Sequence, residues 1–430
     1  MDGSVRPVRG LLAYERLAQD QGLGLLSAPI GRSTPGNFGQ QQICLDNLSD
    51  LRFGKFSSPS VCDQHKSRPL IDYAEIAGND LPKRALQIAA AGGHALMMIG
   101  PPGSGKSMLA ARLSTILPDL SDGERQESAM IHSVAGMPYD DILAGRRPFR
   151  SPHHAASRAG LLGGGSPPMP GEVSLAHNGV LFLDEMPEFG GSTLQLLRQP
   201  IEQGRVSLAR VGGTTIFPAR FMLVAAANPC PCGYLGDPQH DCHCAQAQIS
   251  RYQGRIGGPL MDRFDLVVDV WRSDPAQVLD TGKGSSSGQL RSAVLSARDF
   301  RDWRCSKRAI GSISEQGPTR INAAQASQQV LDEVEKKTVG QSMNPSDRAD
   351  EIIGTCQMGA GAELLEACSL GHKQRMLIEE VSRRYQLSGR GIMRTLAVAR
   401  TIADLCQDET VNEEHILEAV TYRVREVECR

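Results

Sequence analysis

Eight consecutive residues have the types and spacing of a phosphate-binding loop. The segment GPPGSGKS fits G-x-x-x-x-G-K-[ST] at every fixed position. Its glycines let the backbone curl so that N–H groups face phosphate oxygens. The lysine then reaches the β- and γ-phosphates, and the serine hydroxyl binds Mg²⁺. The predicted nucleotide ligands are Gly100, Pro101, Pro102, Gly103, Ser104, Gly105, Lys106 and Ser107.

The segments beside this loop predict the elements that must hold it. ALMMIG before it reads as a buried strand, and SMLAARLSTIL after it as an amphipathic helix, whose N-terminal dipole favours a bound anion. A second apolar strand, GVLFLDEMPEF, carries Asp184 and Glu185 at its end. We expect Asp184 to hold, through water, the Mg²⁺ ion that Ser107 binds, and Glu185 to polarise an attacking water. The pair favours hydrolysis of the nucleotide over binding alone.

Three more polar residues follow along the chain, and their order supports a functional role more strongly than any single one of them does. The apolar segment FMLVAAANP ends near Asn228, which is placed to orient water beside Glu185. Arg263 precedes another apolar strand, and Arg390 opens a helical pattern near the C-terminus. Taken singly, each arginine is more typical of an ordinary surface residue. Their positions after the phosphate loop and the two acids support a functional interpretation.

A cluster of cysteines forms a separate candidate site. The pattern C-x-C-x9-C-x-C supplies enough soft ligands for a tetrahedral, structural zinc ion. Its one-residue spacers are tighter than those usual for structural zinc, so a reduced cysteine-rich loop is the alternative. The other cysteines show no disulfide-framework spacing. The candidate zinc ligands are Cys230, Cys232, Cys242 and Cys244.

Composition sets the broad class. The chain has 430 residues, 40% of them hydrophobic, which is enough for two or three domains with cores of their own. A net charge of -2 gives no whole-protein basicity, so a nucleic-acid partner must meet a local basic surface. No apolar run reaches the length of a membrane span, and no signal-peptide segment opens the chain. We therefore expect a cytoplasmic protein.

Changes in composition divide the chain. Residues 56–71 are predicted as a Ser/Pro-rich linker. Residues 72–275 alternate strand-like and helical patterns, which is typical of an α/β domain with a mainly parallel sheet. Residues 276–350 are predicted as a polar linker and insertion, and residues 351–430 as a small helical domain.

The motif order resembles that of AAA+ ATPases: Walker A, Walker B, sensor 1, arginine finger and sensor 2. Longer segments, among them DYAEIAGNDLPKRALQ, RPFRSPHHAASRAG and LVAAANPCPCGY, are similar to the magnesium-chelatase-like family of YifB and ComM. The resemblance implies an AAA+ core with a helical lid, ATP and Mg²⁺ as cofactors, and a homo-hexameric ring with ATP between subunits. Asn228 would be sensor 1, Arg263 a finger acting on a neighbour's nucleotide, and Arg390 sensor 2. Adenine would bind near residues 76–78.

The same resemblance bears on function. ComM-type proteins are associated with DNA branch migration during natural transformation, so a DNA motor is implied. Residues 1–55 resemble part of a Lon-protease-like domain, through DGSVRPVRG and the segment after it. Leu11 and Leu12 stand where active Lon proteases carry a lysine-bearing segment, and the catalytic-serine part is absent. Proteolysis is therefore not expected.

Candidate DNA contacts lie in two basic segments. RVSLARVGGTTIFPAR predicts a hairpin, whose Arg205 and Arg210 are placed to meet phosphates in the pore of a ring. RRPFRSPHHAASR supplies Arg150, with a structural loop as its alternative. The adjacent His153 and His154 in that segment do not have the spacing of a metal site.

Two other functions stay open. One is a magnesium-chelatase-type ATPase that remodels a protein partner. The other is a degraded nucleotide-binding protein without motor activity. The presence of Glu185 and Arg263 argues against the second.

Overall fold

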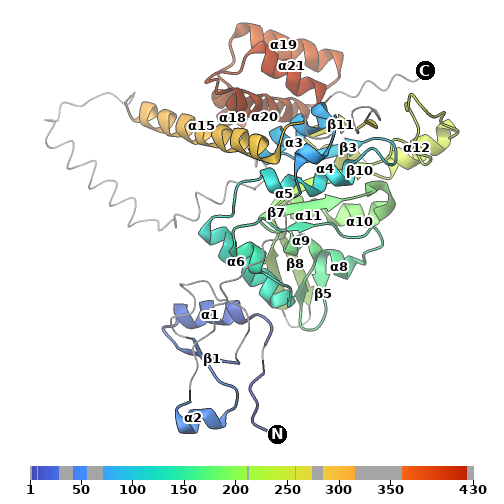
Figure 1. The fold of residues 1–430 in the computed structure, drawn as a ribbon. Helices are drawn as coiled ribbons and strands as arrows, with labels where there is room; N and C mark the ends of the chain where they lie inside the picture. Colours follow the sequence, from blue (N-terminus) through green and yellow to red (C-terminus); the bar gives the residue numbers. More distant parts are fainter. Residues whose placement is uncertain are drawn as a thin grey trace, which may run out of the picture.

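The computed structural model of the chain is drawn in Figure 1. It describes residues 2–6, 8–28, 42–55, 71–210, 213–256, 258–273, 284–314 and 361–423. The predicted linker 56–71, apart from its last residue, lies outside these ranges, as does most of the predicted insertion.

A five-stranded sheet forms the centre of the molecule. Its order is β11-β3-β10-β7-β4, and every neighbouring pair is parallel. The three central strands are buried throughout, as expected for a parallel sheet covered on both faces. The predicted α/β class with a parallel sheet is confirmed. The strands are β3 (Leu96–Ile99), β4 (Phe149–Arg150), β7 (Gly179–Leu183), β10 (Phe221–Ala227) and β11 (Leu266–Asp269).

Alternate residues of the central strands enter two different cores. Met98 and Val224 face a core that includes α3 (Asp80–Gly92), α4 (Lys106–Ala111), α5 (Leu113–Ile116) and the C-terminal helices. Met97 and Leu223 face the other core, which also contains residues of α10 (Gly191–Leu196) and of the hairpin formed by β8 (Arg205–Arg210) and β9 (Gly213–Pro218). Such two-sided burial explains why these strands read as continuous apolar runs.

The C-terminal region is helical, as predicted. It consists of α18 (Gly361–Cys368), α19 (His372–Arg384), α20 (Gly389–Cys406) and α21 (Glu413–Thr421). Leu396 and Ile402 of α20 join the same core as the first face of the sheet. Figure 1 shows these helices, in red and brown, stacked beside α3 and α15 (Ser287–Ser314).

One prediction for this half of the chain was wrong. Within the range predicted as polar linker and insertion, Ser287–Ser314 forms one long helix, α15. Leu290, Val294 and Ala297 recur at helical spacing and are buried. Arg304 also makes a buried pair with Asp404 of α20, at 3.1 Å. The high polar content of the segment concealed a narrow apolar stripe that packs on its neighbours.

The N-terminal segment forms a small α/β unit. It contains α1 (Leu11–Asp20), β1 (Leu25–Ser27), β2 (Gln42–Cys44) and α2 (Ser49–Phe53), with β1 and β2 parallel. Leu12 packs with Ala129 of α6 (Asp122–Ala135), which joins this unit to the rest of the chain.

None of the helices in the described ranges is long and apolar enough to cross a membrane.

Shorter elements complete the description. The remaining elements are η2 (Tyr73–Glu75), α7 (Asp140–Leu143), α8 (Arg158–Leu162), β5 (Gly163–Gly164), β6 (Met169–Pro170), α9 (Glu172–Leu175), η3 (Met186–Phe189), α11 (Arg198–Gln203), β8 (Arg205–Arg210), β9 (Gly213–Pro218), α12 (Gln246–Gly254) and α13 (Gly258–Met261).

Candidate functional site

The phosphate-binding segment is a loop between β3 and α4, as its sequence predicts. A Cβ on Gly100 would lie 2.0 Å from the carbonyl oxygen of Val270, so no other residue fits there without a backbone shift. Gly105 has φ 88°, a conformation that side chains strongly disfavour, and it directly precedes the helix. The loop geometry therefore depends on glycine at these two positions.

Lys106 sits at the centre of the loop. Its Nζ donates to the carbonyl oxygens of Gly100 and Pro101, both at 2.8 Å, and lies 3.4 Å from Asn228 Oδ1. Burial lowers the pKa of the Lys106 amine to about 8, and Asp184 and Glu185 offset part of that effect. Asn228 follows β10, the strand next to β3, and so reaches the same edge of the sheet.

The two predicted Mg²⁺ ligands are in direct contact. Ser107 Oγ donates to Asp184 Oδ2 at 2.6 Å, although β10 lies between the strands that precede these residues. A hydroxyl and a carboxylate are hard oxygen ligands of the kind that Mg²⁺ prefers. The donor set therefore fits this ion.

Glu185 adopts an unusual backbone conformation beside Asp184. Its φ is 48°, in the left-handed region that glutamate rarely enters, and its side chain is half exposed. His154 Nδ1 lies 3.6 Å from Glu185 Oε2. Sequence reasoning considered His154 only as a metal or DNA ligand and missed this contact, because nothing in the spacing links the two residues.

These side chains converge for a topological reason. β3, β10 and β7 are adjacent and parallel, so their carboxyl ends meet at one edge of the sheet. Open α/β sheets bind ligands at that edge. The structure thus gathers Lys106, Ser107, Asp184, Glu185 and Asn228 there.

Arg263 lies elsewhere. It precedes β11, which is parallel to β3, and is therefore at the amino edge of the sheet, opposite the phosphate loop. Its guanidinium pairs with Glu202 of α11. Arg390 is exposed in the first turn of α20, and Arg394 of the same helix pairs with Asp265, close to Arg263 in the chain, at 2.8 Å. Neither predicted arginine is brought into this chain's own phosphate loop.

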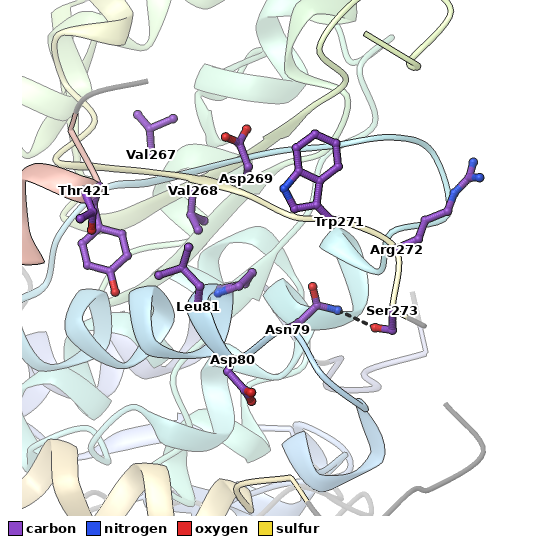
Figure 2. A pocket seen from close by; sticks show the side chains of 12 residues that line it. Asn79, Asp80, Leu81, Val267, Val268, Asp269, Trp271, Arg272, Ser273 and Thr421 are labelled. Carbon is purple, nitrogen blue, oxygen red and sulfur yellow. Dashed lines mark hydrogen bonds between the residues drawn. The ribbon is translucent and has the colours of Figure 1, made fainter. Parts of the chain in front are cut away.

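A cavity of about 380 Å³ lies between the start of α3, strand β11 and the residues that follow β11 (Figure 2). Asn79 and Trp271 line it, and Asn79 Nδ2 donates to Ser273 Oγ at 3.0 Å. Arg272, another lining residue, donates to the carbonyl oxygen of Pro102 at 3.2 Å. The cavity is thus tied to the phosphate loop, and it adjoins the range 76–78 predicted to bind adenine.

The predicted hairpin is present as β8 and β9, with Arg205 paired to Pro218 and Arg210 to Gly213. Arg205 and Arg210 are both exposed. Arg150 differs, because both its Nε and its Nη2 donate to the Glu172 carboxylate at 2.7 Å. The guanidinium of Arg150 is therefore held by a carboxylate of the same chain, whereas Arg205 and Arg210 present theirs on the surface of the hairpin.

The cysteine pattern also converges in space. Cys230, Cys232, Cys242 and Cys244, in the loop after β10, have ligand atoms within 4.8 Å of one another. This group could hold a metal ion. It begins two residues after Asn228.

Fold and site together define a P-loop protein of the AAA+ class. Family models give the particular family: residues 72–278 match "Magnesium chelatase, subunit ChlI", and residues 284–423 match "Magnesium chelatase, subunit ChlI C-terminal". The chain belongs to this magnesium-chelatase-like family, which includes YifB and ComM relatives.

Curated relatives support this assignment. YifB of Salmonella typhimurium is 38% identical over 85% of this chain and 63% of its own length. Competence protein ComM of Haemophilus influenzae is 38% identical over 82% of this chain and 60% of its own. The magnesium-chelatase 67 kDa subunit of Chlorobaculum parvum is 28% identical over 37% of this chain and 24% of its own. The chain spans about three fifths of the length of the YifB and ComM relatives.

Proposed function

We propose that this protein binds ATP with Mg²⁺ and hydrolyses it. The contact between Ser107 and Asp184, beside the buried amine of Lys106, carries the proposal. Mg²⁺ held by these two residues would neutralise charge on the phosphates. Lys106 would leave its backbone acceptors for phosphate oxygens, Glu185 would take a proton from the attacking water, and Asn228 would orient that water.

We propose the cavity at Trp271 as the site of the adenine base. Three features support this: an exposed aromatic ring, the Asn79 amide beside it, and the link from Arg272 to Pro102. An aromatic face stacks on a planar base, and an amide can meet its edge.

We also propose a homo-hexameric ring. Arg263 lies across the sheet from its own phosphate loop, so it can act on a nucleotide only if a second subunit brings one to it. Arg390, in a helix that contacts the same edge through Arg394, would act there as well. Both arginines then stabilise charge on a neighbour's phosphates, while the lid helices follow its nucleotide state.

The proposed substrate of the motor is DNA, in branch migration or a helicase-like step of natural transformation and recombination. Two observations favour it: exposed arginines on the β8–β9 hairpin, and identity to ComM over far more of the chain than to the chelatase subunit. A hairpin that enters the ring pore would bind phosphates without regard to sequence. Action on DNA would place the protein in the cytoplasm.

ATP turnover measured with no DNA, single-stranded DNA and branched DNA tests this function. We expect DNA to stimulate turnover in the natural protein and Lys106→Ala to abolish it. An ATP turnover rate that is the same with no DNA and with each DNA form would rule out the DNA motor. A response to chelatase subunits and porphyrin instead would establish the protein-remodelling alternative, and binding without turnover would indicate a degraded nucleotide-binding protein.

A further inference from the structure

The four cysteines of the loop after β10 have the geometry of a closed metal site. Cys230 Sγ lies 3.3 Å from Cys232 Sγ and 3.6 Å from Cys242 Sγ, and the last two are 3.6 Å apart. Zinc bound by four thiolates at about 2.3 Å separates the sulfurs by about 3.8 Å. A disulfide joins only two sulfurs, at about 2.0 Å. Three mutual contacts of this length therefore match one shared ion better than paired cysteines.

A tight turn after the first C-x-C segment brings the two closely spaced pairs of cysteines together. Gly233 has φ 87°, and its N–H donates to the carbonyl oxygen of Cys230 at 3.0 Å. Tyr234 then stacks on His240 with ring centroids 4.9 Å apart, which brings the second pair of cysteines against the first. Each C-x-C segment thus supplies one side of a single cluster.

We infer that these four cysteines bind one structural Zn²⁺ ion and that the zinc-bound loop holds the phosphate-binding loop in its working shape. Four thiolates complete a tetrahedral shell and leave no position for water, so the ion would not be catalytic. The second half of this inference rests on the proposed function, because it assumes that the phosphate-binding loop binds nucleotide.

The link between the two loops is made by close packing. A Cβ on Gly233 would lie 2.5 Å from Cδ of Pro102, so the cysteine loop presses directly on the phosphate-binding loop. Arg272 bridges them, with one nitrogen 3.2 Å from the carbonyl oxygen of Pro102 and another 3.1 Å from His240 Nδ1. Asp237 lies 3.9 Å from that guanidinium.

The loop also lies beside Asn228, because a Cβ on Gly233 would be 3.8 Å from Cγ of Asn228. Helix α12, which follows the last cysteine, holds the next residue: Gln253 donates to the carbonyl oxygen of Pro229 at 3.0 Å. Metal sites of this kind contribute their binding free energy to local folding. Loss of zinc would therefore loosen the contacts at Pro102 and Asn228 together.

The zinc content of the full chain tests whether the four cysteines bind a zinc ion. Protein purified in a thiol-free reductant should contain one zinc per chain, and Cys230→Ser with Cys244→Ser should lose it. The matched control is Cys305→Ser with Cys406→Ser, which changes two exposed cysteines outside the cluster and should keep the ion. Wild-type protein that has its thiols reduced but neither contains zinc nor takes it up on addition would overturn the site.

Binding of a fluorescent ADP analogue tests whether the zinc-bound loop holds the phosphate-binding loop in shape. Zinc-stripped, reduced protein should bind it at least fivefold more weakly, and added Zn²⁺ should restore the affinity. Gly233→Ala keeps all four ligands; alanine is strained at the φ of 87°, but four thiolates should still hold the ion, so this variant should retain zinc. Its added methyl clashes with Pro102, so it should bind the analogue more weakly, even if stripped protein proves unfolded by circular dichroism. Full affinity in a zinc-loaded Gly233→Ala variant would overturn the coupling. A zinc-loaded wild type that binds no nucleotide would instead refute the proposed ATP site.

Discussion

Ser107 Oγ and Asp184 Oδ2 lie 2.6 Å apart, at the carboxyl edge of a sheet whose central strand separates the two strands that deliver them. The serine hydroxyl at the end of the phosphate-binding loop thus donates a hydrogen bond to the carboxylate that is predicted to hold Mg²⁺. Together they place two hard oxygen atoms, of the kind that Mg²⁺ prefers, at the start of the helix that follows the phosphate-binding loop.

Asp184→Asn should therefore weaken the effect of Mg²⁺ on nucleotide binding. We expect ATP affinity without Mg²⁺ to stay close to that of the natural protein, and the tightening on adding Mg²⁺ to fall roughly tenfold, as for other groups that orient metal ligands. Titration calorimetry with and without Mg²⁺ measures both. An unchanged response to Mg²⁺ would remove Asp184 from the metal site.

The pKa of Lys106 predicts a pH dependence of nucleotide binding. In the nucleotide-free protein, burial lowers this pKa to about 8, so the amine is charged below pH 8 and increasingly neutral above it. Phosphate stabilises the charged form, so binding above pH 8 must take up a proton and affinity must fall as pH rises. Calorimetry at about pH 8.5, just above this pKa, in buffers of different ionisation enthalpy should detect the uptake. Lys106→Met should bind weakly at every pH and show no such uptake.

Trp271 provides a direct probe of the proposed base site. The chain has two tryptophans, so Trp303→Phe leaves Trp271 as the sole indole emitter. We expect ADP to change its fluorescence, and Trp271→Ala to weaken ADP binding about tenfold, the scale of one base-stacking contact. Fluorescence that does not respond to saturating ADP would place the base elsewhere.

Mixed rings test whether Arg263 acts on a neighbouring subunit. Arg263→Ala and Glu185→Gln should each reduce turnover by about 100-fold or more while keeping ATP binding. Mixed together, the two variants should regain part of the activity, because some interfaces would combine an intact Glu185 with an intact Arg263. The control is a chain that carries both Arg263→Ala and Glu185→Gln, because its rings contain no interface with both residues intact. Failure of the mixture, with mixed rings demonstrated, would contradict action in trans.

The hairpin arginines should set the salt dependence of DNA binding. Arg205→Ala with Arg210→Ala should weaken binding to single-stranded DNA, and the slope of log K against log salt should become shallower by about 0.7 for each phosphate that an arginine no longer neutralises. Lys373→Ala, an exposed cation on α19, is the matched control and should change neither. An unchanged slope in the double variant would exclude the hairpin.

Much of this organisation was readable from the chain itself. The strand, loop and helix at Lys106, the two acids after the next apolar strand and the position of Asn228 follow from local patterns, because burial on both faces demands apolar runs and a tight turn demands glycine. The α15 helix was missed for the converse reason. Its few apolar residues at helical spacing are outnumbered by polar ones, and only packing against α3 and α20 shows which face is buried.

The sequence by itself determined which residue types stand at the end of each strand, since that depends on local pattern and order. Only the tertiary structure decided their contacts. It paired Arg150 with Glu172, set His154 beside Glu185 and put Arg263 across the sheet from Lys106. It also closed four cysteines with one-residue spacers into a single cluster. Strand order and loop closure join residues far apart in the chain, and neither leaves a periodic signal in the sequence.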